Sequence, residues 1–132
     1  MANVAKIKEI LATTENKVGV LAQVSSVIAK AGANITAICA CGKGDKAKFM
    51  IVTDDNQKAV AALKEKGYDV KEEEAVKVLL ENKAGALQEM GEKLAGANID
   101  LSHIYGTVGE GNRPAAIIFS SNNDDKAIDL LK

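Results

Sequence analysis

The chain has 132 residues, of which 47% are hydrophobic and 27% charged, a composition typical of globular proteins. Seventeen basic residues stand against eighteen acidic ones, so the net charge is −1 and the basic footprint of a nucleic-acid-binding protein is missing. Aromatic residues make up only 3%, which predicts an aliphatic core, and no apolar run reaches membrane-spanning length.

The first half of the chain predicts the order strand, helix, strand, strand, helix, strand. An extended segment at 5–13 precedes a loop, and apolar residues then recur at helical spacing up to Gly32. Strands are predicted at 35–41 and 46–53, around a turn at 42–45. A helix follows from Asp54 or Asp55, and 68–73 forms a short acidic strand that suits the edge of a sheet. This order is that of the split βαβ, or ferredoxin-like, unit.

The second half repeats this order but stops early. Its predicted elements are a strand at 76–80, a helix between Gly85 and Gly96, strands at 99–108 and 115–120, and a helix from Asn123. Because Lys132 matches Lys64, nothing corresponds to residues 65–74, and we expect the second unit to lack its last strand. Its sheet edge is then open or filled by a neighbour, which favours a homodimer or another homo-oligomer.

Three blocks of sequence occur twice. Residues 15–19 (ENKVG) return as 81–85 (ENKAG), 31–35 (AGANI) as 95–99 (AGANI), and 58–64 as 126–132, at offsets of 66, 64 and 68 residues. The repeat predicts an α+β protein of two ferredoxin-like βαββαβ units with antiparallel sheets, at residues 1–74 and 75–132. The smaller middle offset predicts that the first helix of the second copy is shorter by two residues.

The loop before the first helix of each copy is the main candidate for a binding site. A glycine at the start of a helix, here Gly19 or Gly85, lets a ligand approach the backbone, and the helix N-terminus favours an anion. Asparagines near these helices offer oxygens for an ammonium group and amide donors for a carboxylate, so a free amino acid is the natural ligand. They are Asn16, Asn34, Asn82 and Asn98. Alternatively, Asn16 and Asn82 only cap their helices, and Asn34 and Asn98 only shape a turn.

The repeated blocks, together with Ile104–Val108, resemble the signature of ACT domains, small regulatory modules of amino-acid metabolism, over nearly the whole chain. The resemblance implies that the two units pack side by side. It also implies that an amino acid binds in their interface, against the loop after the first strand and the start of the second. The ligand-binding residues that it implies are Asn16, Val18, Gly19 and Asn34, with Asn82, Ala84, Gly85 and Asn98 in the second copy. Val18 and Ala84 stand where the family usually has proline, and we expect the first copy to hold the better site.

No catalytic constellation is evident, so we expect a binding protein without a cofactor rather than an enzyme. Cys39, Cys41 and His103, with His103 at the position of Cys39 in the repeat, could approach a metal, but small buried thiols are the simpler interpretation. Two cysteines and a start without the apolar core of a signal peptide favour a reduced, cytoplasmic protein. Two alternatives to an amino-acid sensor remain open. One is an interaction module with an empty pocket, and the other is the regulatory subunit of a separate enzyme of amino-acid metabolism.

Overall fold

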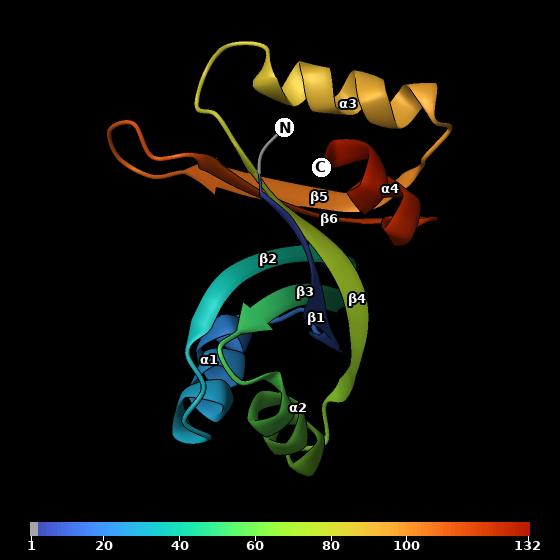
Figure 1. Ribbon diagram of the computed structural model, residues 1–132. Coiled ribbons are helices and arrows are strands. Elements are labelled where there is room, and N and C mark those ends of the chain that lie inside the picture. Colours follow the sequence, from blue (N-terminus) through green and yellow to red (C-terminus); the bar gives the residue numbers. More distant parts are fainter. Residues whose placement is uncertain (1–2) are drawn as a thin grey trace. The chain divides into compact units, whose positions relative to one another are not determined.

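The computed structural model describes residues 3–132, which form six strands and four helices (Figure 1). In chain order they are β1 (Val4–Glu15), α1 (Val20–Lys30), β2 (Ile35–Lys43), β3 (Lys46–Thr53), α2 (Asn56–Glu65), β4 (Asp69–Leu80), α3 (Ala86–Gly96), β5 (Leu101–Val108), β6 (Ala115–Ser121) and α4 (Asp124–Leu131). The hydrogen-bonded strand order is β2-β3-β1-β4-β6-β5. Within residues 3–132, no helix is both long and apolar enough to cross a membrane.

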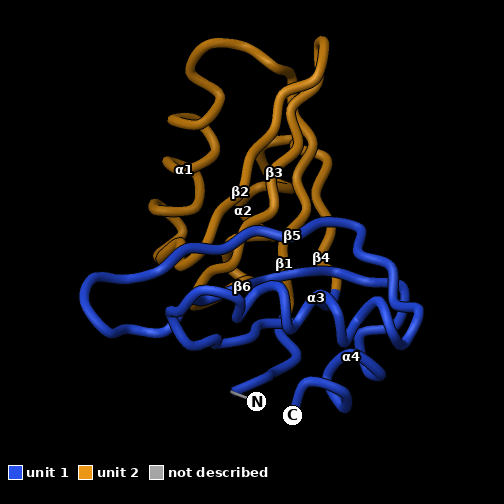
Figure 2. The backbone as a smooth tube through the Cα atoms, turned by 90° about the horizontal axis from the view of Figure 1, so that it is seen from above, with its two compact units in different colours: residues 1–7, 74–132 blue, residues 8–73 orange. Residues whose placement is uncertain are grey.

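The chain divides into two compact units (Figure 2). Residues 8–73 form one of them, called here the 8–73 unit. Residues 1–7 and 74–132 form the other, called here the 74–132 unit. Strands β1 and β4 are each twelve residues long and contribute residues to both units.

In the 8–73 unit, α1 and α2 lie side by side on one face of the sheet (Figure 1). Helix α1 buries Val24 and Ile28, which are four residues apart and therefore on one helix face. The sheet meets them with alternating residues of β1 and β3, such as Ile10, Phe49 and Ile51. Apart from Phe49 and the half-buried Tyr68, the buried and packing residues of this core are aliphatic, as the composition predicts.

The 74–132 unit is built in the same way, with α3 and α4 against one face of its strands. Met90 and Leu94 of α3 and Leu131 of α4 are buried against Val76, Val78 and Phe119 of the sheet. The predicted fold class is therefore confirmed: the chain is an α+β protein of two antiparallel ferredoxin-like units, and the second copy ends after α4 without a last strand of its own.

The place of that missing strand is taken by the start of β1. The amide of Leu79 donates a hydrogen bond to the carbonyl of Asn3 at 2.9 Å. Val4 packs on the core of the 74–132 unit, and Lys6 forms ion pairs with Glu74, at 3.3 Å, and with Asp125. We expected the sheet edge of the second unit to be open or filled by a neighbour, but residues at the start of β1 fill it.

The acidic segment at 68–73 is not the edge strand that the sequence predicted. It is the beginning of β4, which continues to Leu80 and lies between β1 and β6. Four consecutive charged and exposed residues, 71–74, interrupt the apolar pattern at the point where β4 passes from one unit to the other. The interruption made one long strand look like two short ones.

We expected the first helix of the second copy, α3, to be two residues shorter than α1. This prediction is wrong, because α1 and α3 both have eleven residues. Gly32 follows α1 in the left-handed conformation, at φ 84°, and it is Asn98, at φ 59°, that takes this position after α3. The amides of both residues donate to the carbonyl three positions before them. The structural offset is therefore 66 residues, Asn98 corresponds to Gly32, and the true counterpart of Asn34 is Asp100.

The extra residues of the second copy lie in a hairpin instead. The β2–β3 turn spans only Gly44 and Asp45, whereas residues 109–114 connect β5 and β6. The offset between the copies changes there from 66 to 68, since Ile35 and Leu101 hold matching places in the register, as do Thr53 and Ser121.

Candidate ligand-binding site before α1 and α3

Both loops that precede the first helix of a unit end in a left-handed glycine. Gly19 has φ 89° and ψ −2°, Gly85 has φ 88° and ψ −9°, and each is the N-cap residue of its helix. A side chain at this φ would be strained, which explains why glycine occurs at the same place in both copies. The predicted position of the two glycines at the helix starts is therefore confirmed.

The N-termini of α1 and α3 have no side-chain cap, in contrast to those of α2 and α4. Asp55 accepts a hydrogen bond from the amide of Lys58 and thereby caps α2, and Asn123 caps α4 through the amide of Lys126. At α1 and α3 no side chain does this, so Asn16 and Asn82 are not caps. The very first amides, those of Val20 and Ala86, donate to the carbonyls of Lys17 and Lys83 at 3.3 Å. The next two amides of α1 and of α3 remain available to an anion.

Asn16 stabilises a hairpin. Its side-chain nitrogen donates to the carbonyl of Gly44 at 3.0 Å, and its backbone amide donates to the carbonyl of Asp45 at 2.9 Å. A Cβ on Gly42 would lie 2.7 Å from the Asn16 side-chain nitrogen, so glycine makes room for this contact. Asn16 is exposed, but its amide group already has a partner.

Asn82 stands at the same place in the other copy and is not used in this way. Within the described residues its side chain has no hydrogen-bond partner, whereas Asn16 bonds to Gly44. In the second copy, residues 109–114 connect the two strands in place of the turn that holds Gly44. Asn82 borders a cavity of about 850 Å³ in the 74–132 unit. Four segments besides the loop line this cavity. They are Asn3 before β1, Leu79 and Leu80 at the end of β4, Ala86, Glu89 and Lys93 on one face of α3, and Asn112 and Pro114 between β5 and β6.

The charges around this cavity balance. Glu81 and Glu89 stand against Lys83 and Lys93. The Lys83 ammonium lies 3.1 Å from the Glu81 carboxylate, and this hydrogen bond, with the charge attraction of the same partner, raises the pKa of Lys83 above its usual value. A site with two anions, two cations and amide side chains suits a ligand that carries both charges.

The remaining predicted site residues do not all gather at the loops. Asn34 follows α1, an eleven-residue helix about 16 Å long, so it lies at the opposite end of α1 from Asn16. There its backbone amide donates to the Asp54 carboxylate at 2.8 Å. Asn98 occupies the turn after α3 and is likewise distant in the fold from Asn82. Each unit by itself therefore separates its two predicted asparagines.

The loop before α1 exposes hydrophobic side chains. Val18 is 102% exposed, and Leu21 in the first turn of α1 is 57% exposed. In the other copy Ala84 replaces Val18, while Leu87 repeats Leu21 at 54% exposure. Val18 and Leu21 thus form an apolar tip in the 8–73 unit, which the smaller alanine reduces in the 74–132 unit.

Cys39 and Cys41 share a face of β2, as predicted, since they pair with Met50 and Lys48 of β3. Their predicted burial is wrong, because Cys41 is exposed and Cys39 is half-buried. The register also gives His103 the position of Ala37 rather than of Cys39. Among residues 3–132 no group of three or more candidate ligands could hold a metal ion.

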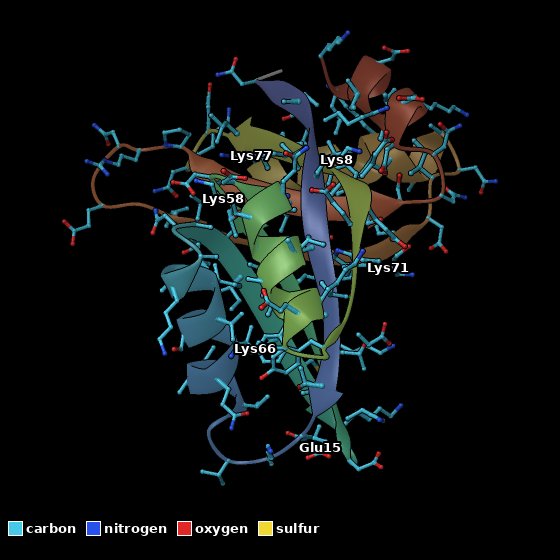
Figure 3. All side chains as sticks on the ribbon, turned by 90° about the horizontal axis from the view of Figure 1, so that it is seen from below. Lys8, Glu15, Lys58, Lys66, Lys71 and Lys77 are labelled. Carbon is cyan, nitrogen blue, oxygen red and sulfur yellow. The ribbon has the colours of Figure 1, made fainter. Side chains whose placement is uncertain are left out.

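A second cavity, of about 870 Å³, lies between α1 and α2 and was not anticipated from the sequence. Lys58 and Lys66, both labelled in Figure 3, border it at the two ends of α2, and Lys30 borders it from α1. Residues with small side chains, Ala31, Ala61 and Ala62, also line this cavity. Because these side chains are small, they leave space between α1 and α2.

Sequence reasoning missed Asn112, Pro114, Glu89 and Lys93 at the first cavity. One signal for Asn112 and Pro114 was present, because the connection between the predicted strands at 99–108 and 115–120 is longer than the matching turn at 42–45. Glu89 and Lys93 are four residues apart, and their position depends on which face α3 turns away from the core.

The fold and the two glycine-led loops define a protein of paired ferredoxin-like α+β modules. The sequence profile of the ACT domain pair matches residues 5–131, and the chain belongs to this family. Among curated protein sequences, none matches the chain significantly.

Solved structures support the same fold. A crystal structure of a protein from Bacteroides thetaiotaomicron is similar with a TM-score of 0.89 and 27% identity, over 97% of this chain and 88% of that one. The ligand-free regulatory subunit of aspartate kinase from Thermus thermophilus gives a TM-score of 0.69 at 16% identity, over 98% and 95% of the two chains. The corresponding subunit from Thermus flavus gives 0.62 at 16%, over 97% and 94%. At 16% identity, the two kinase subunits show the fold alone.

Proposed function

We propose that this ACT domain pair is a regulatory protein that binds a free amino acid in the cavity beside Asn82. The observation that carries the proposal is an asparagine, Asn82, whose side chain has no hydrogen-bond partner within residues 3–132. It lies at the uncapped start of α3 and on the border of a charge-balanced cavity. The family supports a regulatory role, and the aspartate kinase subunits of the same fold suggest an enzyme of amino-acid metabolism as the regulated partner.

Each group of an amino acid has a counterpart in this cavity. The carboxylate suits the amides of the second and third residues of α3 together with the ammonium groups of Lys83 and Lys93. The ammonium group suits the carboxylates of Glu81 and Glu89, and Asn82 and Asn112 offer amide groups that serve either end. The volume of about 850 Å³ lies within the usual range of ligand pockets, roughly 300–1,000 Å³, and leaves space for a side chain.

The binding roles of Asn16, Val18, Gly19, Asn34, Ala84, Gly85 and Asn98 stay predictions. Among them Gly85 acts through the backbone, because it sets the start of α3 beside the cavity. Asn16 would have to give up its hydrogen bond to Gly44 before it could bind a ligand, which lowers the affinity expected for the first copy.

A thermal-shift series with each of the twenty amino acids tests the proposal. A ligand at 100 times its dissociation constant should stabilise the protein by about 2.7 kcal/mol. Asn82→Ala should weaken binding of the active amino acid about tenfold or more, because hydrogen bonds to charged groups contribute about 1.5–3 kcal/mol. Isothermal titration calorimetry then gives the dissociation constants.

Gln57→Ala is the matched control, since Gln57 is an exposed amide side chain of α2 in the other unit, has no hydrogen-bond partner within the described residues and has no predicted binding role. It should leave the affinity unchanged. If none of the twenty amino acids raises the melting temperature, or if Gln57→Ala weakens binding as much as Asn82→Ala, the proposed site is wrong.

One observation favours a second candidate function, that of an interaction module. The apolar tip of Val18 and Leu21 is costly to leave in water, and such exposed apolar groups mark protein contacts. For this function, Val18→Asp should abolish association measured by sedimentation velocity, whereas Ala84→Asp in the other copy should not.

A further inference from the structure

Strands β2 and β3 place three sulfur-bearing side chains on one face of the sheet. In the register of this hairpin, Cys39 lies opposite Met50, and Cys41 lies opposite Lys48. Directly opposite residues of an antiparallel pair share a face, and so do residues two apart in one strand. Cys39, Cys41 and Met50 therefore point to the same side, and they are called here the sulfur cluster.

The sulfur cluster lies on the sheet face that is turned away from α1 and α2. Phe49 and Ile51, the neighbours of Met50 in β3, are buried in the core under these helices. Because side chains alternate along a strand, Met50 points to the other face. Met50 and Cys39 are half-buried there, and Cys41 is exposed. Both cysteines are free thiols, and the exposure of Cys41 opens the cluster to solvent.

The spacing of the two cysteines suits a metal ion between their sulfur atoms. Residues two apart in a strand are separated by roughly 6.6–6.8 Å. Two metal–sulfur bonds of about 2.3 Å each span up to about 4.6 Å. Each sulfur therefore has to lean about 1 Å along the strand, which the choice of χ1 rotamer provides. The contact of the Cys41 sulfur with the carbonyl of Gly42, at 4.0 Å, is weak and leaves this sulfur able to move.

Met50 is placed to supply a third sulfur ligand. Opposite residues of neighbouring strands have Cβ atoms about 4.5–5.5 Å apart, and diagonal neighbours, at roughly 7–8 Å, are still within reach of a long side chain. Met50 is opposite Cys39 and diagonal to Cys41. Its unbranched thioether side chain is flexible and adapts to irregular surroundings. An ion between the two thiolates is therefore within reach of the Met50 sulfur.

The charges beside the sulfur cluster favour a monovalent ion. Lys48 lies opposite Cys41, and Lys43, two residues after Cys41, lies opposite Lys46, so all three lysines share the face of the cluster. Glu15, opposite Lys46 in β1, offsets one of these three positive charges. Two thiolates and a monovalent cation carry a charge of −1, whereas two thiolates and a divalent cation are neutral. Positive surroundings stabilise the anionic complex and not the neutral one.

We propose that the sulfur cluster binds Cu(I), through the thiolates of Cys39 and Cys41 and the thioether of Met50. Among the described residues no three histidine, cysteine or carboxylate groups gather at one place, so a thioether has to complete the set. Thiolates and thioethers are soft ligands that suit Cu(I), whereas structural zinc sites are almost always four-coordinate. On binding, Cu(I) displaces the two thiol protons, which pass to the solvent, and no electron is transferred. The site is independent of the amino-acid site proposed above.

The test is an anaerobic titration in which the reduced protein takes Cu(I) from its coloured bicinchoninate complex. The wild type should bind one ion per chain, and Cys39→Ser and Cys41→Ser should each remove this binding. Met50→Leu nearly conserves the side-chain volume. It should weaken the affinity at least about tenfold, the lower end of the loss when a supporting group of a metal site is removed. Met90→Leu, in the core of the 74–132 unit, is the matched control and should leave the affinity unchanged.

X-ray absorption at the copper edge tests the ligand set directly. It should show three sulfur neighbours in the wild type and two in Met50→Leu. Cys41→Ser, at an exposed position, keeps the test valid if Cys39→Ser fails to fold. A wild type that takes no Cu(I) from the indicator overturns the proposal, and so does a Met50→Leu variant with unchanged affinity. One ion per two chains also overturns it, because thiols of different copies would then share the ion, as does displacement of Cu(I) by an equal concentration of Zn²⁺.

Discussion

At the scale of single residues, three glycines of this chain differ in their effect on stability, and three substitutions show the difference. Gly19→Ala and Gly85→Ala should each destabilise the protein by about 1–2 kcal/mol, because an L-residue is strained at φ near +89°. Gly91→Ala, inside α3, should instead stabilise it by about 0.5–1 kcal/mol, since glycine is a poor helix former and a methyl group there meets no atom within 4 Å. Urea unfolding measures all three. A stabilising Gly85→Ala would contradict the left-handed helix start.

The residue scale also shows how far the sequence predicts the site. Gly19 and Gly85 were predictable, because a glycine in a repeated block before a helical pattern indicates a special backbone conformation. The roles of Asn16 and Asn82 were not, because they depend on residues far along the chain. Asn16 bonds to Gly44, and within the described residues Asn82 has no such bond to the 109–114 connection, which replaces that turn in the second copy. Local pattern predicts the backbone of the loop, and tertiary contacts decide which side chain remains available.

At the scale of elements, the start of β1 belongs to a unit formed mostly by residues 74–132. Removing residues 1–7 should expose β4 and speed hydrogen exchange at the amide of Leu79, which donates to Asn3. Val4→Ala is a milder variant and should cost about 1 kcal/mol, because it removes half-buried methyl groups from this core. Hydrogen exchange followed by mass spectrometry measures both effects.

Ala5→Ser is a matched control in the same strand, since Ala5 is exposed, and it should leave the exchange of Leu79 unchanged. Unchanged exchange after removal of residues 1–7 would mean that β4 is protected without this strand.

Element order was predictable because apolar periodicity and turn residues agree along most of the chain. Element length was not predictable at β1 and β4. The pattern of β4 breaks at Lys71–Glu74, where the strand passes between units and its side chains are exposed. The repeat itself misled at one point: the identical blocks 31–35 and 95–99 differ in structural position by two residues, because Asn98 adopts the left-handed conformation that Gly32 adopts in the first copy.

At the scale of the whole molecule, the two units share strands and should unfold together. β1 supplies residues 4–7 to the 74–132 unit and residues 8–15 to the 8–73 unit, and β4 is divided in the same way at residues 73 and 74. Unfolding one unit frees part of a strand on which the other depends. Each unit has fewer than about 75 residues and is marginal alone. We therefore expect a single cooperative transition.

Two core substitutions test this expectation, one in each unit. Phe49→Ala in the 8–73 unit and Phe119→Ala in the 74–132 unit remove fully buried rings and should each cost about 3–5 kcal/mol. If the units are coupled through β1 and β4, calorimetry of each variant still shows one transition, at a lower temperature, whose calorimetric and van't Hoff enthalpies agree. If Phe119→Ala instead splits the melting curve, so that the 8–73 unit melts later and unchanged, the shared strands do not couple the units. A ligand bound beside Asn82 would then stabilise only the 74–132 unit.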